Sequence, residues 1–273
     1  MGKIKQSTIY VLLFIIAFLV ILSINKLLAM VLLLIVLCIL IGKNLYLGKI
    51  IKANKLYASK NYSEALKLYR QTVTKENIPG FIINNYLIME LKYGDCTIAE
   101  NYINSLSLDN SKIKSTDLLS INISKSLVAW KNNKTEEAIN NLKRLLEESE
   151  TTYLYETLTS LLIVSNKIDD ALTIINKGLN YNDSSDVLKS NFAEANYLLG
   201  NYNEAEEKFK ALVDSNVSFM EPYYYLGLIL LNKQEKDAAL KVLNKATSFN
   251  DSLVSLVNSE KINNLITSIS SRR

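Results

Sequence analysis

The chain has 273 residues, of which 49% are hydrophobic, and a formal net charge of +4. It contains only 2 prolines and 8 glycines, which disfavours a turn-rich all-β protein and favours long helices with short connections. Residues 1–63 carry eight lysines and no acidic residue, so the remainder of the chain is slightly acidic, which argues against a nucleic-acid partner.

The first predicted elements are two uncharged apolar stretches, residues 7–24 and 27–42, separated by Asn25 and Lys26. At a helical rise of 1.5 Å per residue they are roughly 24 to 27 Å long, close to the hydrocarbon core of about 30 Å. We therefore expect a transmembrane hairpin over residues 1–44, with the lipid bilayer as one partner. A cleaved secretory signal or a re-entrant hairpin are the alternatives.

Lysines flank this hairpin on both sides, and only one lies in its connection. The positive-inside rule then predicts a multi-pass protein of the cell membrane with both termini and the following domain in the cytoplasm. The next helix should begin near Leu45, a few residues after the second apolar stretch. The two elements could therefore form one continuous or gently bent helix.

The rest of the chain is an internal repeat marked by one alanine per unit. The steps between these alanines are 34, 39, 33, 34 and 34 residues. The residues are Ala65, Ala99, Ala138, Ala171, Ala205 and Ala239. A fixed period near 34 predicts stacked pairs of helices. The longer second step places five extra residues around 108–116, which leaves the stacking register of the second and third units open.

The last unit shows most clearly how such a helix pair is built. Pro222 lies just inside the first helix, where its missing N–H is harmless. Gly227 on the first helix and Ala239 on the second are small, which lets the two backbones approach closely. The polar stretch 232–236 supplies the connection.

This pattern resembles the tetratricopeptide repeat, in which an alanine follows a short polar turn of the form Gly-Asp-Tyr-x-Glu-Ala. The turns at 61–65 (NYSEA), 94–99 (GDCTIA) and 200–205 (GNYNEA) are similar to that form, whereas the turns before Ala138 and Ala171 are looser. The family's proline at the end of the second helix is missing. The resemblance implies an all-α solenoid of about six repeats over residues 45–273, with a C-terminal capping helix from about residue 251.

In that family the first helix of each repeat lines a concave groove that holds a protein or peptide partner. Transferred by register, the resemblance implies twelve groove residues. They are Asn54, Tyr57, Asn84, Lys92, Trp130, Lys131, Glu156, Ser160, Glu194, Tyr197, Tyr224 and Asn232. Packing between repeats is the alternative role for each aromatic residue. Trp130 is the best single candidate for a contact because tryptophan is frequent at binding hot spots.

Catalytic and metal-binding patterns are missing from the sequence. There is no histidine, no glycine-rich phosphate loop, and no metal-binding spacing between Cys38 and Cys96. Acidic pairs such as Glu136-Glu137 lie near predicted helix starts, where they favour the helix dipole and face solvent. We expect a protein that is not an enzyme, with no cofactor, metal or small-molecule substrate.

Together these features predict a membrane-anchored scaffold that binds other proteins through its concave groove and recruits or organises them at the cytoplasmic face. Two alternatives remain open at this point. The array could face outward as an envelope or export assembly factor, or it could be the regulatory subunit of a membrane enzyme.

Overall fold

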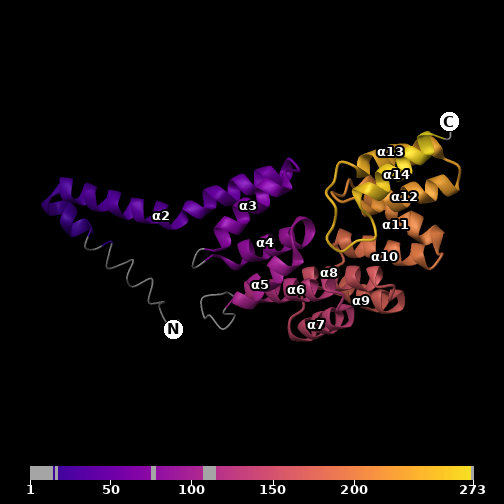
Figure 1. The fold of residues 1–273 in the computed structure, drawn as a ribbon, viewed down its shortest axis with the longest axis horizontal. Helices are drawn as coiled ribbons and strands as arrows, with labels where there is room; N and C mark the ends of the chain where they lie inside the picture. Colours follow the sequence, from indigo (N-terminus) through magenta and orange to yellow (C-terminus); the bar gives the residue numbers. More distant parts are fainter. Residues whose placement is uncertain (1–14, 16–17, 75–77, 107–114, 272–273) are drawn as a thin grey trace. The chain divides into compact units, whose positions relative to one another are not determined.

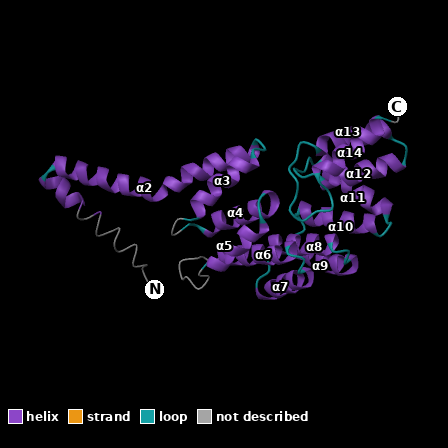
Figure 2. Cartoon of the chain, in the orientation of Figure 1, coloured by secondary structure: helices purple, strands orange, loops and turns teal. Residues whose placement is uncertain are grey.

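The computed structural model describes residues 15, 18–74, 78–106 and 115–271, and the chain divides into two compact units, residues 1–76 and 77–273. Helices make up the regular secondary structure of the described residues (Figure 2), as the low proline and glycine content predicted.

The first unit is a hairpin of α2 (Lys26–Ala58) and α3 (Tyr62–Val73), which pack against each other. Residues 18–24 are also helical, and Asn25 interrupts the helix there. The Asn25 side chain caps α2 by accepting hydrogen bonds from the backbone N–H groups of Leu27 (3.0 Å) and Leu28 (3.1 Å). The 33 residues of α2 run from the second apolar stretch through the first predicted repeat helix. The prediction of one continuous helix is therefore confirmed.

The structure does not support the predicted transmembrane hairpin. Within the described part of the chain, no helix is both long enough and apolar enough to cross a membrane. Residues 27–42, the second predicted span, form only the first part of the 33-residue helix α2, which continues to Ala58. Most of the first predicted span, residues 7–24, lies outside the described residues. The predicted location in the cell membrane, with its orientation, depended on these spans and is therefore wrong, and the bilayer as a partner is not supported.

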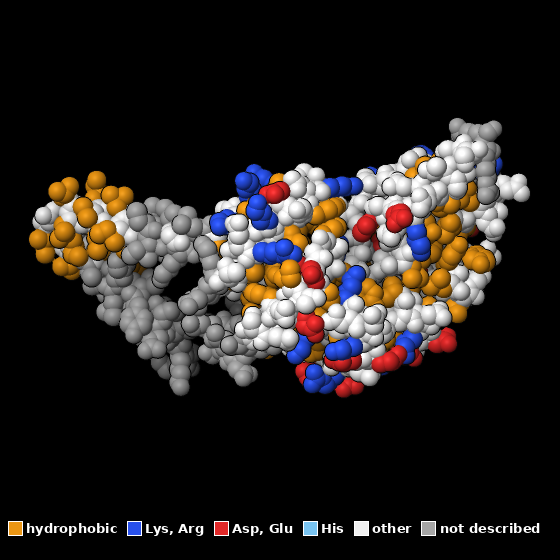
Figure 3. Space-filling view, viewed as in Figure 1, with side chains coloured by type: hydrophobic (Ala, Val, Ile, Leu, Met, Phe, Trp, Pro, Cys, Tyr) orange, Lys and Arg blue, Asp and Glu red, His pale blue; other side chains and the backbone are white. Residues whose placement is uncertain are grey.

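Hydrophobic side chains nevertheless gather at the start of this unit, over residues 19–35 (Figure 3). Leu27 is 72% exposed and Met30 is 62% exposed, whereas Ala29 is fully buried. Further along α2, Ile50 and Ala53 are buried, and α3 buries Ala65, Leu66 and Tyr69. The core of the first unit therefore lies in the second half of α2.

In its described residues, the second unit contains five successive helical hairpins and one further helix (Figure 1). The hairpins are α4 (Gly80–Tyr93) with α5 (Cys96–Ser105), α6 (Ser115–Lys131) with α7 (Thr135–Glu148), α8 (Thr152–Val164) with α9 (Ile168–Tyr181), α10 (Asp186–Leu198) with α11 (Tyr202–Asp214), and α12 (Glu221–Asn232) with α13 (Lys236–Ala246). The last helix is α14 (Ser259–Ser270), which packs against α13. The predicted capping helix therefore begins at Ser259, because residues 251–258 form a loop.

The turns inside the hairpins share one backbone conformation. Five residues before the repeat alanine, the chain adopts a left-handed conformation at Lys60, Asn133, Asn166, Gly200 and Gln234. In each case the next N–H bonds back five residues, as Lys134 does to the Ala129 carbonyl (2.9 Å). This is the Schellman ending of a helix, which satisfies carbonyls that the helix leaves free. The second repeat differs, because Gly94 has a φ of −120° and the Glu90 carboxylate accepts from the Asp95 N–H instead.

The repeat alanines lie where the two helices of a hairpin meet, and all six are fully buried. At Gly227 the approach is so close that an added Cβ would lie 2.7 Å from the Leu243 side chain. The stacking of the second on the third repeat is also resolved. Helix α4 packs against α6, and the Ser124 hydroxyl donates to the Asn84 side-chain oxygen across this contact (2.7 Å). The period of about 34 residues thus corresponds to the packing unit.

Candidate functional site

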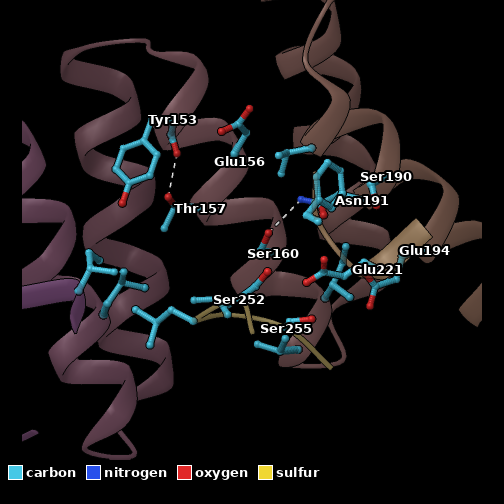
Figure 4. A pocket seen from close by; sticks show the side chains of 18 residues that line it. Tyr153, Glu156, Thr157, Ser160, Ser190, Asn191, Glu194, Glu221, Ser252 and Ser255 are labelled. Carbon is cyan, nitrogen blue, oxygen red and sulfur yellow. Dashed lines mark hydrogen bonds between the residues drawn. The ribbon is translucent and has the colours of Figure 1, made fainter. Parts of the chain in front are cut away.

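The second unit contains a cavity of about 270 Å³ whose walls come mainly from α8, α10, the start of α12 and the loop 251–258 (Figure 4). Ile88 of α4 and Leu127 of α6 extend one wall. The first helices of neighbouring repeats pack side by side, as α8 does with α10 and α10 with α12. The cavity therefore lies on the face that these first helices share.

Helix α8 presents one row of side chains to the cavity. Tyr153, Glu156, Thr157 and Ser160 follow the three- and four-residue spacing that places side chains on one helix face. The N-cap Thr151 fixes the start of this helix, because its hydroxyl accepts a hydrogen bond from the Leu154 N–H (3.2 Å). Figure 4 shows Tyr153 and Thr157 on one side of the cavity.

Helix α10 is tied to α8 by polar contacts beside the cavity. The hydroxyl of its N-cap Ser185 donates to the Glu156 carboxylate (2.6 Å). The buried Asn191 amide donates to the hydroxyl oxygens of Thr159 (2.8 Å) and Ser160 (3.0 Å). Burial raises the pKa of Glu156, and the bond from Ser185 partly offsets this effect. These contacts hold the polar groups of two successive repeats in fixed positions.

Two further carboxylates, Glu194 of α10 and Glu221 of α12, line the cavity opposite Tyr153 (Figure 4). Glu194 is 4% exposed and accepts a hydrogen bond from the Tyr225 hydroxyl (2.7 Å). Burial raises the pKa of Glu194 to about 7; Glu221 also raises it, whereas the bond from Tyr225 and the charge of Lys261 lower it. The cavity is therefore acidic, and its charge varies near neutral pH.

The loop between α13 and α14 closes the fourth side of the cavity. Asp251 joins the two ends of this loop, because one of its carboxylate oxygens accepts hydrogen bonds from both the N–H (2.8 Å) and the hydroxyl (2.5 Å) of Ser259. Ser252, Leu253, Val254 and Ser255 line the cavity between these ends. Compact loops with closed ends of this kind are frequently functional.

The structure brings three of the twelve predicted groove residues to this cavity, namely Glu156, Ser160 and Glu194. Tyr197 and Tyr224 lie close by in sequence, but both rings pack against Tyr225. That packing is the alternative role considered for the aromatic residues. The predicted binding role of these five residues stays a prediction.

The other predicted residues do not line the cavity. In the first unit, Asn54 accepts a hydrogen bond from the Tyr69 hydroxyl (2.7 Å), and the Tyr57 ring contacts the Tyr62 ring. Asn84 joins α4 to α6. Lys92 lies over the Tyr93 ring and Lys131 over the Trp130 ring, each with its nitrogen 5.1 Å from the centroid. Asn232 is exposed at the end of α12.

Sequence reasoning missed Asn191, Glu221 and the loop 252–255. Asn191 lies three residues before Glu194, and this helical spacing could have identified it. Glu221 is the first residue of α12, whereas the repeat register pointed to residues later in that helix. The loop could not have been found by register, because it follows the last repeat.

A comparison with protein families matches residues 191–252 to the tetratricopeptide repeat. The matched segment extends from α10 through α13 and covers the fifth and sixth predicted repeats. No curated protein sequence matches the chain. The fold and this match define an all-α repeat protein with tetratricopeptide repeats in the matched segment.

Solved structures of the same kind are similar to the chain at low identity. A tetratricopeptide repeat protein from Parabacteroides merdae is 19% identical over 82% of this chain and 98% of its own, with a TM-score of 0.44. TTC0263, a thermophilic protein of this type from Thermus thermophilus, is 15% identical over 83% of this chain and 99% of its own (TM-score 0.46). YrrB, described as having an unusual peptide-binding site, is 16% identical over 65% and 90% (TM-score 0.40).

Proposed function

We propose that this chain is a non-catalytic protein-interaction scaffold, which binds a segment of a partner polypeptide in the cavity between α8, α10, α12 and the loop 251–258. The observation that carries the proposal is the cavity itself. It lies on the face shared by successive first helices, and its polar groups are held in place by contacts between repeats. Such preformed polar groups reduce the entropy lost when a partner binds.

The chemistry of the lining fits a peptide. Apolar side chains such as Ile163, Val187 and Val254 offer surface for aliphatic groups, and Ser160 and Asn191 offer hydrogen bonds to an extended backbone. A cavity of about 270 Å³ takes one or two side chains of a partner and leaves the remainder of its segment on the surface. Recruitment of one protein to another through such contacts is the activity proposed here.

Photocrosslinking in cells tests this proposal. A photoreactive phenylalanine analogue replaces Tyr153, which lines the cavity and is 40% exposed. The matched control replaces Tyr202 of α11, which is 50% exposed and does not line the cavity. We expect a discrete crosslinked protein at position 153 that disappears when Ser160→Phe fills the cavity. Identical products at both positions, or none at 153, would contradict the proposal.

A further inference from the structure

The buried glutamates of this unit differ in how their charge is balanced. Glu206 of α11 is 7% exposed, and both of its oxygens face lysines: Lys210 lies 2.7 Å from one and Lys233 lies 2.5 Å from the other. The ammonium groups of these two lysines hold the pKa of Glu206 below its usual range. The chain therefore neutralises this carboxylate by itself.

Glu221 lies in the opposite situation. It is also 7% exposed, and its Oε2 atom, like Oε1 of Glu206, is buried without a hydrogen-bond partner among the described residues, but no lysine lies beside it as Lys210 lies beside Glu206. Within the same part of the chain, no lysine or arginine nitrogen lies within ion-pair distance of Glu221 or Glu194. Leaving a charged oxygen buried and unsatisfied is costly, and such an oxygen in a native site calls for an explanation.

The surroundings of the two carboxylates do not supply the missing positive charge. Glu156 of α8 adds a third acidic group to the cavity, and the Tyr225 hydroxyl contributes a hydrogen bond but no charge. The positively charged residue that acts on Glu194 is Lys261 of α14, whose charge lowers the pKa of Glu194. Its ammonium group, however, donates to the Leu256 carbonyl (2.7 Å) and so stabilises the loop.

We infer that the cavity binds a cationic side chain, an arginine or a lysine of the partner polypeptide, and that Glu221 and Glu194 accept its charge. This inference rests on the proposed function and names the chemistry of the partner. Glu221 supplies a free oxygen at the cavity wall, and the apolar lining at Val254 and Ile163 supports the aliphatic stem of such a side chain. Charge-assisted hydrogen bonds of this kind are about twice as strong as neutral ones.

Selection from a random peptide library tests the inference. The immobilised full chain is offered a displayed library of dodecapeptides, and the lysine and arginine content of the bound peptides is compared between variants. The test variant is Glu221→Gln, which keeps the shape and removes the charge. The matched control is Glu207→Gln on α11, whose side chain is 76% exposed and lies beside Lys208. A blocked variant, Ser160→Phe, and its surface control, Ser268→Phe, show whether binding uses the cavity.

We expect the wild-type chain and E207Q to enrich peptides with a basic residue, and E221Q to lose at least tenfold in affinity for them. If peptides bind in a manner that S160F blocks, but without basic enrichment or without an effect of E221Q, the inference is overturned and the proposed function stands. If no bound peptide is sensitive to S160F, the proposed function itself fails.

Free cations form the last arm of the test. L-Arginine amide and spermidine are titrated against the wild-type chain and against E221Q by calorimetry. We expect both to bind at least a hundredfold more weakly than the selected peptides, since they lack the neighbouring backbone. Equal or tighter binding with the same dependence on Glu221 would overturn a polypeptide as the source of the cation.

Discussion

Two buried acidic regions of the second unit, only one helix apart, show how the same side chain can serve different purposes. On α11, Glu206 is surrounded by Lys210 and Lys233 and links the fifth and sixth repeats. On the cavity side, Glu194 and Glu221 have similar burial, but no such cation pairs with them among the described residues. The first arrangement is complete within the chain. The second becomes complete only with a positive charge from outside, which is why we assign the binding role to it.

The largest expected effect concerns the pH dependence of stability. The pKa of Glu194 is about 7 in the folded chain and 4.5 in its ordinary state, so the folded state binds the proton more tightly. Stability contributed by the protonated form is therefore full below pH 4.5 and is lost as the pH rises through 7. Between pH 5 and pH 8 the free energy of unfolding of the wild-type chain should fall by about 2–3 kcal/mol more than that of Glu194→Gln.

Urea unfolding of both chains at several pH values measures this difference. The groups around Glu194 that also carry charge or titrate are Glu221, Tyr225 and Lys261, and all remain in E194Q. Parallel pH profiles for the two chains would show that Glu194 keeps an ordinary pKa. The distinction between the two acidic regions would then lose its electrostatic basis.

The next effect isolates the one hydrogen bond that Glu194 receives. Tyr225→Phe removes the hydroxyl but keeps the ring, which stacks on Phe209 with centroids 5.4 Å apart. We expect the free energy of unfolding to fall by about 2 kcal/mol at pH 8, because a buried carboxylate loses its donor. Thermal unfolding measures the loss, with Tyr224→Phe as the control. Equal effects of both substitutions would contradict the assigned bond.

A smaller effect compares the two regions directly. Glu206→Gln should lower the free energy of unfolding by about 1 kcal/mol, since the lysines around it are half exposed and their pairing is partly screened. Glu221→Gln should raise it by about 1 kcal/mol at pH 8, since it removes an unsatisfied charge next to Glu194. Denaturant titration measures both. The same sign for the two substitutions would remove the contrast between the regions.

The smallest effect on overall stability is expected from the hydrogen bonds that join Asp251 to Ser259 at the ends of the loop. Asp251→Ala removes the acceptor of two hydrogen bonds from Ser259. We expect less than about 1 kcal/mol of global destabilisation but faster amide exchange in residues 252–257, because the ends of the loop are no longer held together. Hydrogen exchange with mass spectrometry measures this, with Asn264→Ala on α14 as the control. Unchanged exchange in D251A would show that other contacts hold the loop.

The repeat architecture of the second unit could be predicted because its signals are local and periodic. Each buried alanine and each turn before it recurs at a spacing set by one helix pair. The membrane hairpin was predicted from the same kind of local pattern, and the structure does not support it. Among the described residues no helix is both long enough and apolar enough to cross a membrane, although the continuation of residues 27–42 into one helix that ends at Ala58 was predicted correctly.

The candidate site could be predicted only in part for a related reason. Register along the first helices led to Glu156, Ser160 and Glu194, which line the cavity. It also led to Trp130, which does not line it. The unsatisfied oxygen of Glu221 and the closing loop depend on contacts between segments distant in sequence, for example Asp251 with Ser259 across a loop that follows the repeats. Periodicity carries no information about such contacts.

A double-mutant cycle tests the central claim most directly. The tightest basic peptide from the selection is synthesised with its arginine and with neutral citrulline, or with its lysine and norleucine, and each form is titrated against the wild-type chain and E221Q. We predict that neutralising either Glu221 or the basic residue of the peptide lowers the affinity at least tenfold. Neutralising both should lower the affinity little more than neutralising one of them does. Two independent, additive losses would contradict an ion pair between Glu221 and the partner.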